Sequence, residues 1–339
     1  MLLSAVAARA GSFMPLSFVL AGIVAAFSAF SFAALSARLP LAGGEADYVH
    51  EAYSRTWFTR SIGYAVLLVG IAASATIAQG FAGYLHLFID VPEPVDIIFL
   101  FVMLGGVAAI GISESVWLAT IITIIEMSGL LFVIVIGAPS IPDLFSSDVQ
   151  LIPSLDISSW SVTATGAFLA FYAFVGFEDM VNIAEEVKQP ERVLPIAIIT
   201  ALVVSTLLYG LFSLSLLAVL PLEAIVSSDA PLATMVDAKG FNPLWIGIVG
   251  ILAILNGALV QIIKGARVLY GMSRRGWAPP WFQQLADKTK TPVNGTVVVS
   301  ITILSLALTL PIERLAAITS AITLFVFMFV NLSLSVLKK

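Results

Sequence analysis

The sequence lacks cysteine altogether and contains only two histidines, His50 and His86, in 339 residues. The absence of cysteine excludes disulfides and thiolate metal sites, and two imidazoles are too few for a multi-histidine metal site. The sequence also lacks zinc-protease motifs, a Gly-x-Ser-x-Gly nucleophile elbow and paired intramembrane aspartates. We therefore expect no bound metal, no cofactor and no enzymatic activity.

Charge is also scarce. Charged residues make up 11% of the chain and hydrophobic residues 60%, and the mean hydropathy is +1.05. A soluble domain carries about twice that charged fraction. The sequence contains no basic tract that would bind nucleic acid. This composition predicts an all-α polytopic membrane protein that is surrounded by the lipid bilayer.

Long apolar stretches are what the sequence has in abundance. Nine of them are nearly free of charge and long enough to cross a bilayer. Turn-forming segments such as "DVPEP" at 90–94 separate them, and no soluble domain fits in between. The predicted spans are Pro15–Ala37, Ser61–Phe88, Ile97–Ser113, Ser115–Gly137, Ile157–Phe177, Leu194–Leu222, Phe241–Ile263, Pro292–Ile312 and Leu315–Leu337.

The sixteen Lys and Arg residues are divided unevenly between the two ends of these spans. One end receives thirteen of them, and the other receives only Arg9, Lys239 and Arg314. Cytoplasmic loops are enriched in basic residues, so the end with thirteen is predicted to be cytoplasmic. We expect a multi-pass protein of the cell membrane, that is, the inner or plasma membrane.

The predicted orientation places Met1 outside the cytoplasm. The first residues have no basic region and are too short to cross the membrane. One interpretation is that a further helix precedes the chain, with Leu2–Ala8 as its outer tail. The alternative is a genuine nine-span protein with an external N-terminus. The charge distribution favours the first interpretation.

Glu126 lies in the middle of the fourth span, within "ATIITIIEMSGLLFVIVIG". A carboxylate is costly at this depth, so Glu126 is a candidate functional residue. A buried carboxyl group can hold and release a proton, which suits a proton relay. The alternative is a permanently neutral Glu that hydrogen-bonds to a neighbouring helix. In the seventh span, Asn256 is a candidate for a hydrogen bond between helices, and the Lys264 ammonium is expected to reach toward the membrane surface.

The segment "FVGFEDMVNIAEEVKQPERVLP" at 174–195 raises a problem of length. A continuous helix from Ile157 to Glu186 would be about 45 Å long, whereas the bilayer core is about 30 Å thick. A break at Val175–Gly176–Phe177 resolves this, because glycine tolerates non-helical backbone. The broken ends expose carbonyl groups that attract an ammonium or Na⁺ and N–H groups that attract an anion. Asp179 is a candidate cap for the second half.

Four segments of the chain resemble the amino acid–polyamine–organocation family of secondary transporters. "FYAFVGFEDMVNIAEEVKQPERVLPIAI" resembles the sixth helix of that family and the loop that follows it. "SARLPLAGGEADYVHEAYS" resembles the loop after the second helix, "LNGALVQIIKGARVLYGMSRRGWAPPWF" the eighth helix, and "TPVNGTVVV" the start of the ninth. The four segments occur in the family's order over most of the chain.

This resemblance implies a leucine-transporter-like fold of two inverted five-helix repeats, in which helices one and six are broken. The nine spans would then be helices two to ten of one transmembrane domain, 1–339. Residues 1–12 would be a remnant of helix 1, 13–137 the rest of the first repeat and 157–337 the second repeat. The chain departs from the family pattern because it lacks most of helix 1 and helices 11–12.

The resemblance also implies a substrate site at the broken sixth helix. The carbonyl groups near Tyr172, Ala173 and Val175 would receive the substrate ammonium. The ring of Tyr172 would cover the site, and Phe174 and Phe177 would form its walls. With Gly176, these six residues are the expected substrate-binding set.

Three residues are the expected site of ion coupling. Glu126 falls near the position of a buried Lys in some proton-coupled relatives. Asn256 lies near a sodium-like site of related folds, and Glu178 lies in the first turn after the break. Protons or Na⁺ would be the coupling ions.

The function implied by the resemblance is secondary active transport of amino acids by a permease, coupled to protons by symport or antiport. One alternative is a transporter of polyamines or other cationic substrates, because Glu178 and Asp179 are acidic. Another alternative is a non-transporting fragment of such a permease.

Overall fold

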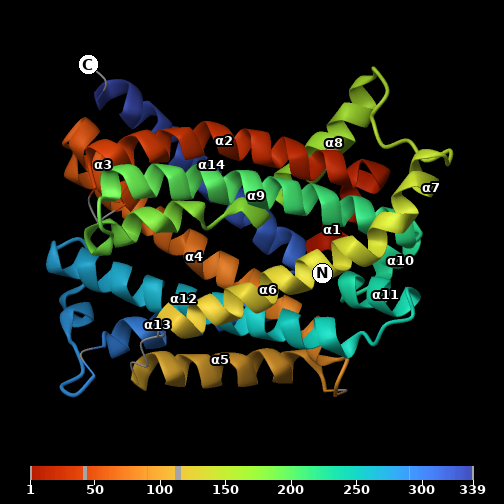
Figure 1. Cartoon of the computed structure of the whole chain (residues 1–339). Helices are drawn as coiled ribbons and strands as arrows, with labels where there is room; N and C mark the ends of the chain where they lie inside the picture. The colour runs from red at the N-terminus through yellow and green to blue at the C-terminus, as the bar shows by residue number, and fades with distance from the viewer. Residues whose placement is uncertain (1, 41–43, 90, 111–115, 290, 338–339) are drawn as a thin grey trace.

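The computed structural model (Figure 1) describes the whole chain except residues 1, 41–43, 90, 111–115, 290 and 338–339. Its α-helices are α1 (Leu2–Ala10), α2 (Met14–Arg38), α3 (Gly44–Tyr53), α4 (Thr56–Leu85), α5 (Glu93–Ile110), α6 (Val116–Gly137), α7 (Ile141–Phe145), α8 (Ile157–Ala170), α9 (Pro190–Val219), α10 (Leu222–Ser227), α11 (Pro231–Ala238), α12 (Leu244–Arg274), α13 (Val293–Thr309) and α14 (Ile312–Leu337). Its 3₁₀ helices are η1 (Gly11–Phe13), η2 (Ala138–Ser140), η3 (Phe171–Phe174), η4 (Phe177–Glu186) and η5 (Pro280–Gln283). The described residues form no β-strand.

The long helices run side by side as a bundle, which makes the chain an all-α multi-pass membrane protein. Seven helical segments of the described part are long and apolar enough to cross a membrane, and α5 and α13 are shorter apolar helices. They correspond to the nine stretches predicted from the sequence. The seven are Leu2–Arg38, Thr56–Leu85, Thr120–Phe145, Ile157–Val181, Pro190–Val219, Leu244–Arg274 and Ile312–Leu337.

One helix extends beyond its predicted apolar span. The seventh span was predicted to end at Ile263, but α12 continues to Arg274. Apolar sequence ends where charged residues begin, yet Lys and Arg are good helix formers, so the helix itself continues. Lys264 and Arg267 therefore lie on the same continuous helix as the apolar span.

Two apolar clusters form the interior. The larger one joins α2, α9 and α14 to the segment after α8, and the smaller one joins α4, α5, α12 and α13. Close approach of α2 and α9 requires a small residue, because a Cβ on Gly22 would lie 2.5 Å from Thr206 Oγ1. The helix α6 contacts both α9 and α12, so it lies between the two groups of helices.

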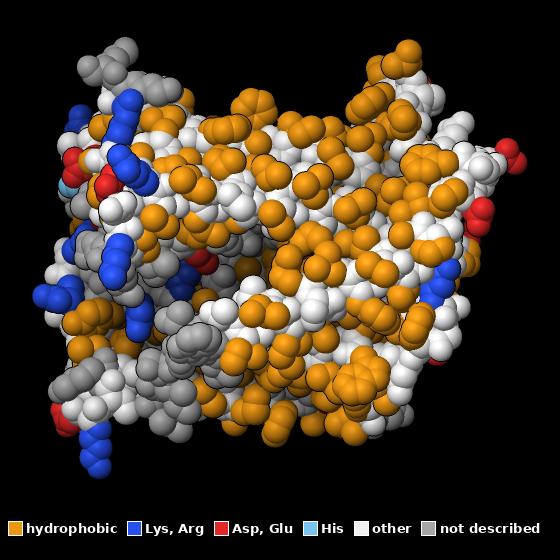
Figure 2. All heavy atoms as spheres, in the orientation of Figure 1, with side chains coloured by type: hydrophobic (Ala, Val, Ile, Leu, Met, Phe, Trp, Pro, Cys, Tyr) orange, Lys and Arg blue, Asp and Glu red, His pale blue; other side chains and the backbone are white. Residues whose placement is uncertain are grey.

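The two ends of the bundle differ in charge. In Figure 2, Lys and Arg side chains gather at the end that carries α3 and the α12–α13 connection, which we call the basic end. Few appear at the end that carries α7, α10 and α11. The segregation of basic residues predicted from the sequence is thus present in the three-dimensional structure.

Candidate functional site

The helix that begins at Ile157 is broken near its middle. Asp156 caps its start by accepting a hydrogen bond of 2.8 Å from the Ser159 backbone N–H. The side-chain hydrogen bond from Ser154 is the main reason that the pKa of Asp156 is lowered to about 2. The α-helix ends at Ala170, tightens into η3 and then stops, because Val175 is extended.

Gly176 makes the break possible. Its φ is +129°, a conformation that residues with a Cβ rarely adopt. A Cβ built on Gly176 would meet no atom within 4 Å, so the constraint comes from the backbone and not from crowding. The chain then resumes as η4. The structure breaks the helix at the residue that the sequence indicated.

Glu178, and not Asp179, holds the break in shape. The Gly176 N–H donates to Glu178 Oε2 at 2.7 Å, and the Asp179 N–H donates to the Gly176 carbonyl at 3.1 Å. Glu178 is only 3% exposed. The expectation that Asp179 caps this turn is therefore wrong. The longer Glu side chain can fold back to an N–H two residues earlier, which leaves Asp179 free to face another helix.

Aromatic rings surround the break. The Phe174 ring lies 5.3 Å from the Tyr209 ring of α9, and the Phe177 ring lies 5.4 Å from Phe327 of α14. Tyr172 is partly buried, and its hydroxyl donates to the Ala73 carbonyl of α4 at 2.8 Å. The residues before and after the break thus pack against three different helices, α4, α9 and α14.

Glu126 lies in the middle of α6, which packs against α9 and α12. Asn256 lies on α12, one of these two neighbouring helices. Glu126 Oε1 and Asn256 Oδ1 are buried without a hydrogen-bond partner among the described residues. The two unpaired oxygens therefore lie on helices that pack against each other.

A charged cluster that the sequence did not predict lies toward the basic end. Lys264 of α12 forms an ion pair with Asp179 of η4, and these side chains are 17% and 25% exposed. Glu45 of α3 is only 3% exposed and faces the same cluster. Its burial raises its pKa to about 7, an effect that the charge of Lys264 partly opposes. Figure 2 shows a hollow between α9 and α6 in which charged side chains are visible.

Lys264 therefore does not reach toward the membrane surface as expected. It turns to a carboxylate 85 residues away in the sequence. Glu45 was not predicted because nothing near it in the sequence indicates burial. The only local sign is an acidic residue in the first turn of a short helix, and most such residues are exposed to solvent.

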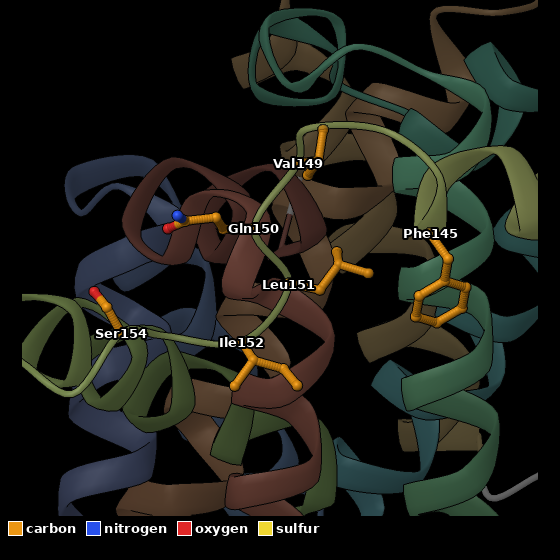
Figure 3. A pocket seen from close by; sticks show the side chains of 6 residues that line it. All are labelled: Phe145, Val149, Gln150, Leu151, Ile152 and Ser154. Atoms are coloured by element: carbon orange, nitrogen blue, oxygen red, sulfur yellow. The ribbon is translucent and has the colours of Figure 1, made fainter.

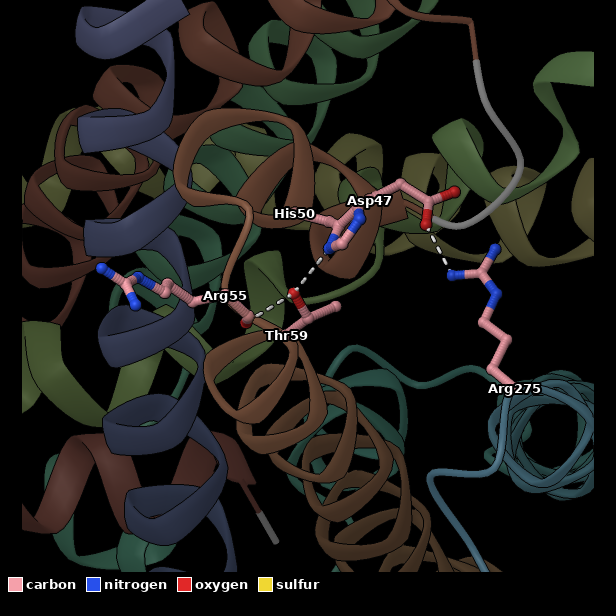
Figure 4. A network of polar contacts seen from close by, with 5 residues as sticks. All are labelled: Asp47, His50, Arg55, Thr59 and Arg275. Carbon is pink, nitrogen blue, oxygen red and sulfur yellow. Dashed lines mark hydrogen bonds and ion pairs between the residues drawn. The ribbon is translucent and has the colours of Figure 1, made fainter.

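A second set of polar contacts fixes α3 at the basic end (Figure 4). Arg275 at the end of α12 forms an ion pair of 2.8 Å with Asp47 of α3. His50 Nδ1 lies 3.2 Å from Thr59 Oγ1, and Thr59 also donates to the Arg55 carbonyl. Two ion pairs thus connect α12 to other elements at this end, one to η4 and one to α3.

The pocket drawn in Figure 3 does not belong to this site. It has a volume of about 380 Å³ and is lined by Phe145, Val149, Gln150, Leu151, Ile152 and Ser154. Phe145 is the last residue of α7, and the others belong to the connection between α7 and α8 at the end opposite the basic end. No ionisable side chain is among them, so this pocket offers no acid, base or charged group to a ligand. The described residues also contain no group of three His, Cys, Asp or Glu that would hold a metal ion.

The fold and the broken helix define the class of protein: a polytopic α-helical membrane protein in which a discontinuous helix meets a buried acid. The amino acid permease family matches residues 2–339, and the chain belongs to this family. The description of this family is that of amino acid permeases, which are transport proteins.

Curated relatives cover nearly the whole chain. "Cationic amino acid transporter 3, mitochondrial" of Arabidopsis thaliana is 28% identical over 97% of this chain and 57% of its own length. The branched-chain amino acid permease BcaP of Bacillus subtilis (strain 168) is 26% identical over 98% of this chain and 75% of its own length. The methylthioribose transporter of the same organism shows the same identity and coverage. The chain thus spans a little over half the length of the plant relatives.

Proposed function

We propose that this chain belongs to a secondary transporter of amino acids that binds its substrate at the break between η3 and η4. The observation that carries the proposal is Gly176 at φ +129° inside an otherwise apolar span, in a chain of the amino acid permease family. A broken helix offers carbonyl groups at one end and N–H groups at the other, which suit a zwitterion. The names of the relatives support amino acids of both cationic and branched-chain type as candidate substrates.

The lining residues have distinct roles in this proposal. The carbonyl groups near Tyr172, Ala173 and Val175 bind the substrate ammonium, and Phe174 and Phe177 exclude water. The Tyr172 ring covers the ligand while its hydroxyl is anchored to α4. Glu178 preserves the shape of the break through its bond to Gly176, so its role is positioning.

Glu126 is the proposed site of proton coupling. It is a lone acid in the middle of α6, with one buried oxygen unpaired among the described residues. A carboxylate in this position is stable only when a proton or another cation neutralises it. Alternate loading and release of a proton would link transport to a proton gradient across the cell membrane, with the basic end in the cytoplasm.

Uptake of radiolabelled amino acids into liposomes that contain the 339-residue chain tests this proposal. We expect saturable uptake that responds to an imposed proton gradient. Glu126→Gln should abolish accumulation driven by the gradient but leave exchange largely intact. Glu51→Gln changes an exposed acid on α3 and is the matched control. Accumulation by Glu126→Gln that equals the wild type from about pH 5 to 8 would contradict the role of Glu126.

A further inference from the structure

The hydrogen bonds that shape the break come from two consecutive residues of η4. Glu178 Oε2 accepts from the Gly176 N–H at 2.7 Å, and the Asp179 N–H donates to the Gly176 carbonyl at 3.1 Å. The Gly176 N–H belongs to the same planar peptide group as the Val175 carbonyl, so its bond to Glu178 also fixes the direction of that carbonyl. The shape of the break therefore depends on where η4 holds residues 178 and 179.

The segment η4 has little rigidity of its own. It is a run of ten residues in the 3₁₀ conformation, from Phe177 to Glu186. Hydrogen bonds in a 3₁₀ helix have poorer geometry than those in an α-helix, and runs longer than about four residues are uncommon. Its position is set by other elements, and it packs against α2, α3 and α9.

The helix α12 reaches η4 through a side chain. In the described part of the chain, α12 is not among the elements that pack closely against η4. Lys264 Nζ nevertheless forms an ion pair with Asp179 Oδ1. Two turns further along the same face of α12, a Cβ on Gly271 would meet no atom within 4 Å, so this face is open. The long Lys264 side chain thus connects two elements that are otherwise little packed against each other.

We infer that Lys264 is a positioning residue of the substrate site: through its ion pair with Asp179 it holds η4 where the break has the shape that binds an amino acid. This inference rests on the proposed substrate site at the break and adds to it a residue from a distant helix. Lys264 does not line the site. Without it, the Asp179 carboxylate turns toward water, and the Asp179 N–H leaves the Gly176 carbonyl.

An ion pair that only stabilises the fold would give a different pattern of effects. Lys264→Met leaves a carboxylate unpaired, so it lowers stability and binding in both cases. Lys264→Met/Asp179→Asn contains no unpaired charge, so its stability returns toward that of the wild type in both cases. Only a positioning role keeps binding weak in the double variant, because methionine and asparagine do not hold η4 to α12.

Calorimetric binding of L-leucine and L-arginine to the purified chain in lipid nanodiscs, with chemical unfolding of the same samples, tests the inference. Lys264→Met/Asp179→Asn should bind both amino acids about tenfold or more weakly than the wild type, although its unfolding midpoint is close to that of the wild type. Lys264→Arg retains the charge and should bind within about threefold of the wild type. Arg275→Met/Asp47→Asn removes the other ion pair of α12 and is the matched control, with a change in binding of less than about twofold.

A thiol in η4 reports its position without any substrate. Ala184 of η4 is fully buried, and the chain has no cysteine, so Ala184→Cys introduces a unique thiol. In the otherwise unchanged chain this thiol should be protected from a water-soluble maleimide. Addition of Lys264→Met/Asp179→Asn should accelerate its labelling by about tenfold or more, because η4 opens locally. Ala7→Cys on α1 is also buried and should stay protected in both backgrounds.

Two results would overturn the inference and leave the proposed substrate site intact. One is wild-type affinity in the Lys264→Met/Asp179→Asn variant, and the other is labelling of Ala184→Cys at the same rate with and without the ion pair. Failure of both amino acids to bind the wild-type chain would overturn the proposed function. The labelling rates would then still decide whether Lys264 positions η4.

Discussion

At the scale of single residues, Gly176 decides where the helix breaks. Its φ of +129° is a conformation that residues with a Cβ rarely adopt. A Cβ at this position would meet no neighbouring atom, so crowding is not the reason that glycine is needed here. Glu178 adds a short hydrogen bond that fixes the turn. A substitution at Gly176 therefore changes the allowed backbone conformation without introducing a clash with neighbouring side chains.

Gly176→Ala should strain the backbone by about 1–3 kcal/mol and weaken amino acid binding, because the break must shift to relieve the strain. Gly106→Ala is the matched control: Gly106 lies inside α5, and a Cβ there also meets nothing within 4 Å. The control should leave binding unchanged and stabilise the helix slightly. Thermal unfolding in detergent and ligand binding measure both variants. Equal effects of the two substitutions would show that the φ of Gly176 is unimportant.

Glu45 shows how burial changes a residue that looks ordinary in the sequence. Its pKa is raised from 4.5 to about 7 by burial. The folded protein thus binds this proton more tightly than the unfolded chain. The resulting stabilisation is complete below about pH 4.5 and is lost as the pH rises through about 7.

Glu45→Gln should remove this dependence on pH. At pH 5 the variant and the wild type should have similar stability, whereas at pH 8 the variant should be more stable by up to about 3 kcal/mol. Thermal unfolding of both proteins at the two pH values measures the difference, and the exposed Glu51→Gln is again the control. A stability difference that does not change between pH 5 and 8 would show that Glu45 does not titrate in this range.

At the scale of secondary-structure elements, α12 holds the basic end together. Its two ion pairs differ in environment: the Lys264–Asp179 pair is mostly buried, whereas Arg275 of the Arg275–Asp47 pair is 51% exposed. The first attaches α12 to the second half of the broken helix, and the second attaches it to α3. Because the pairs lie on one helix about three turns apart, their contributions can be compared within one element.

The buried pair should matter more. Lys264→Met leaves Asp179 unpaired and should destabilise the protein by on the order of 2 kcal/mol, between the values for exposed and fully buried pairs. The double variant Lys264→Met/Asp179→Asn should recover most of that loss. Arg275→Met should cost less than about 1 kcal/mol, and high salt should reduce the difference further. Chemical unfolding of the four proteins gives these values, and equal losses from both single variants would contradict the ranking.

At the scale of the whole molecule, the uneven distribution of basic residues predicts how the chain lies in a membrane. The absence of cysteine makes the prediction easy to test, since any introduced thiol is unique. Asp148 and Asp287 are both exposed, and they lie at the end opposite the basic end and at the basic end, respectively.

In intact cells, Asp148→Cys should react with a membrane-impermeant thiol reagent, whereas Asp287→Cys should react only after the membrane is permeabilised. The cysteine-free wild type measures background labelling. The reverse pattern would show that the basic end faces outward, and labelling of both variants in intact cells would show that the predicted orientation is not unique.

The sequence by itself determined the features that depend on local composition. The apolar stretches identified the spans, because a bilayer selects for uninterrupted hydrophobic length. Gly176 identified the break because the helix around it was too long for the membrane. The tertiary structure alone decided the partners of the charged residues: Glu178 caps the break, Asp179 pairs with Lys264, and Glu45 is buried beside them. Another such contact joins Asp47 to Arg275, which lie 228 positions apart along the chain. Neither hydropathy nor periodicity indicates which distant helices will contact each other.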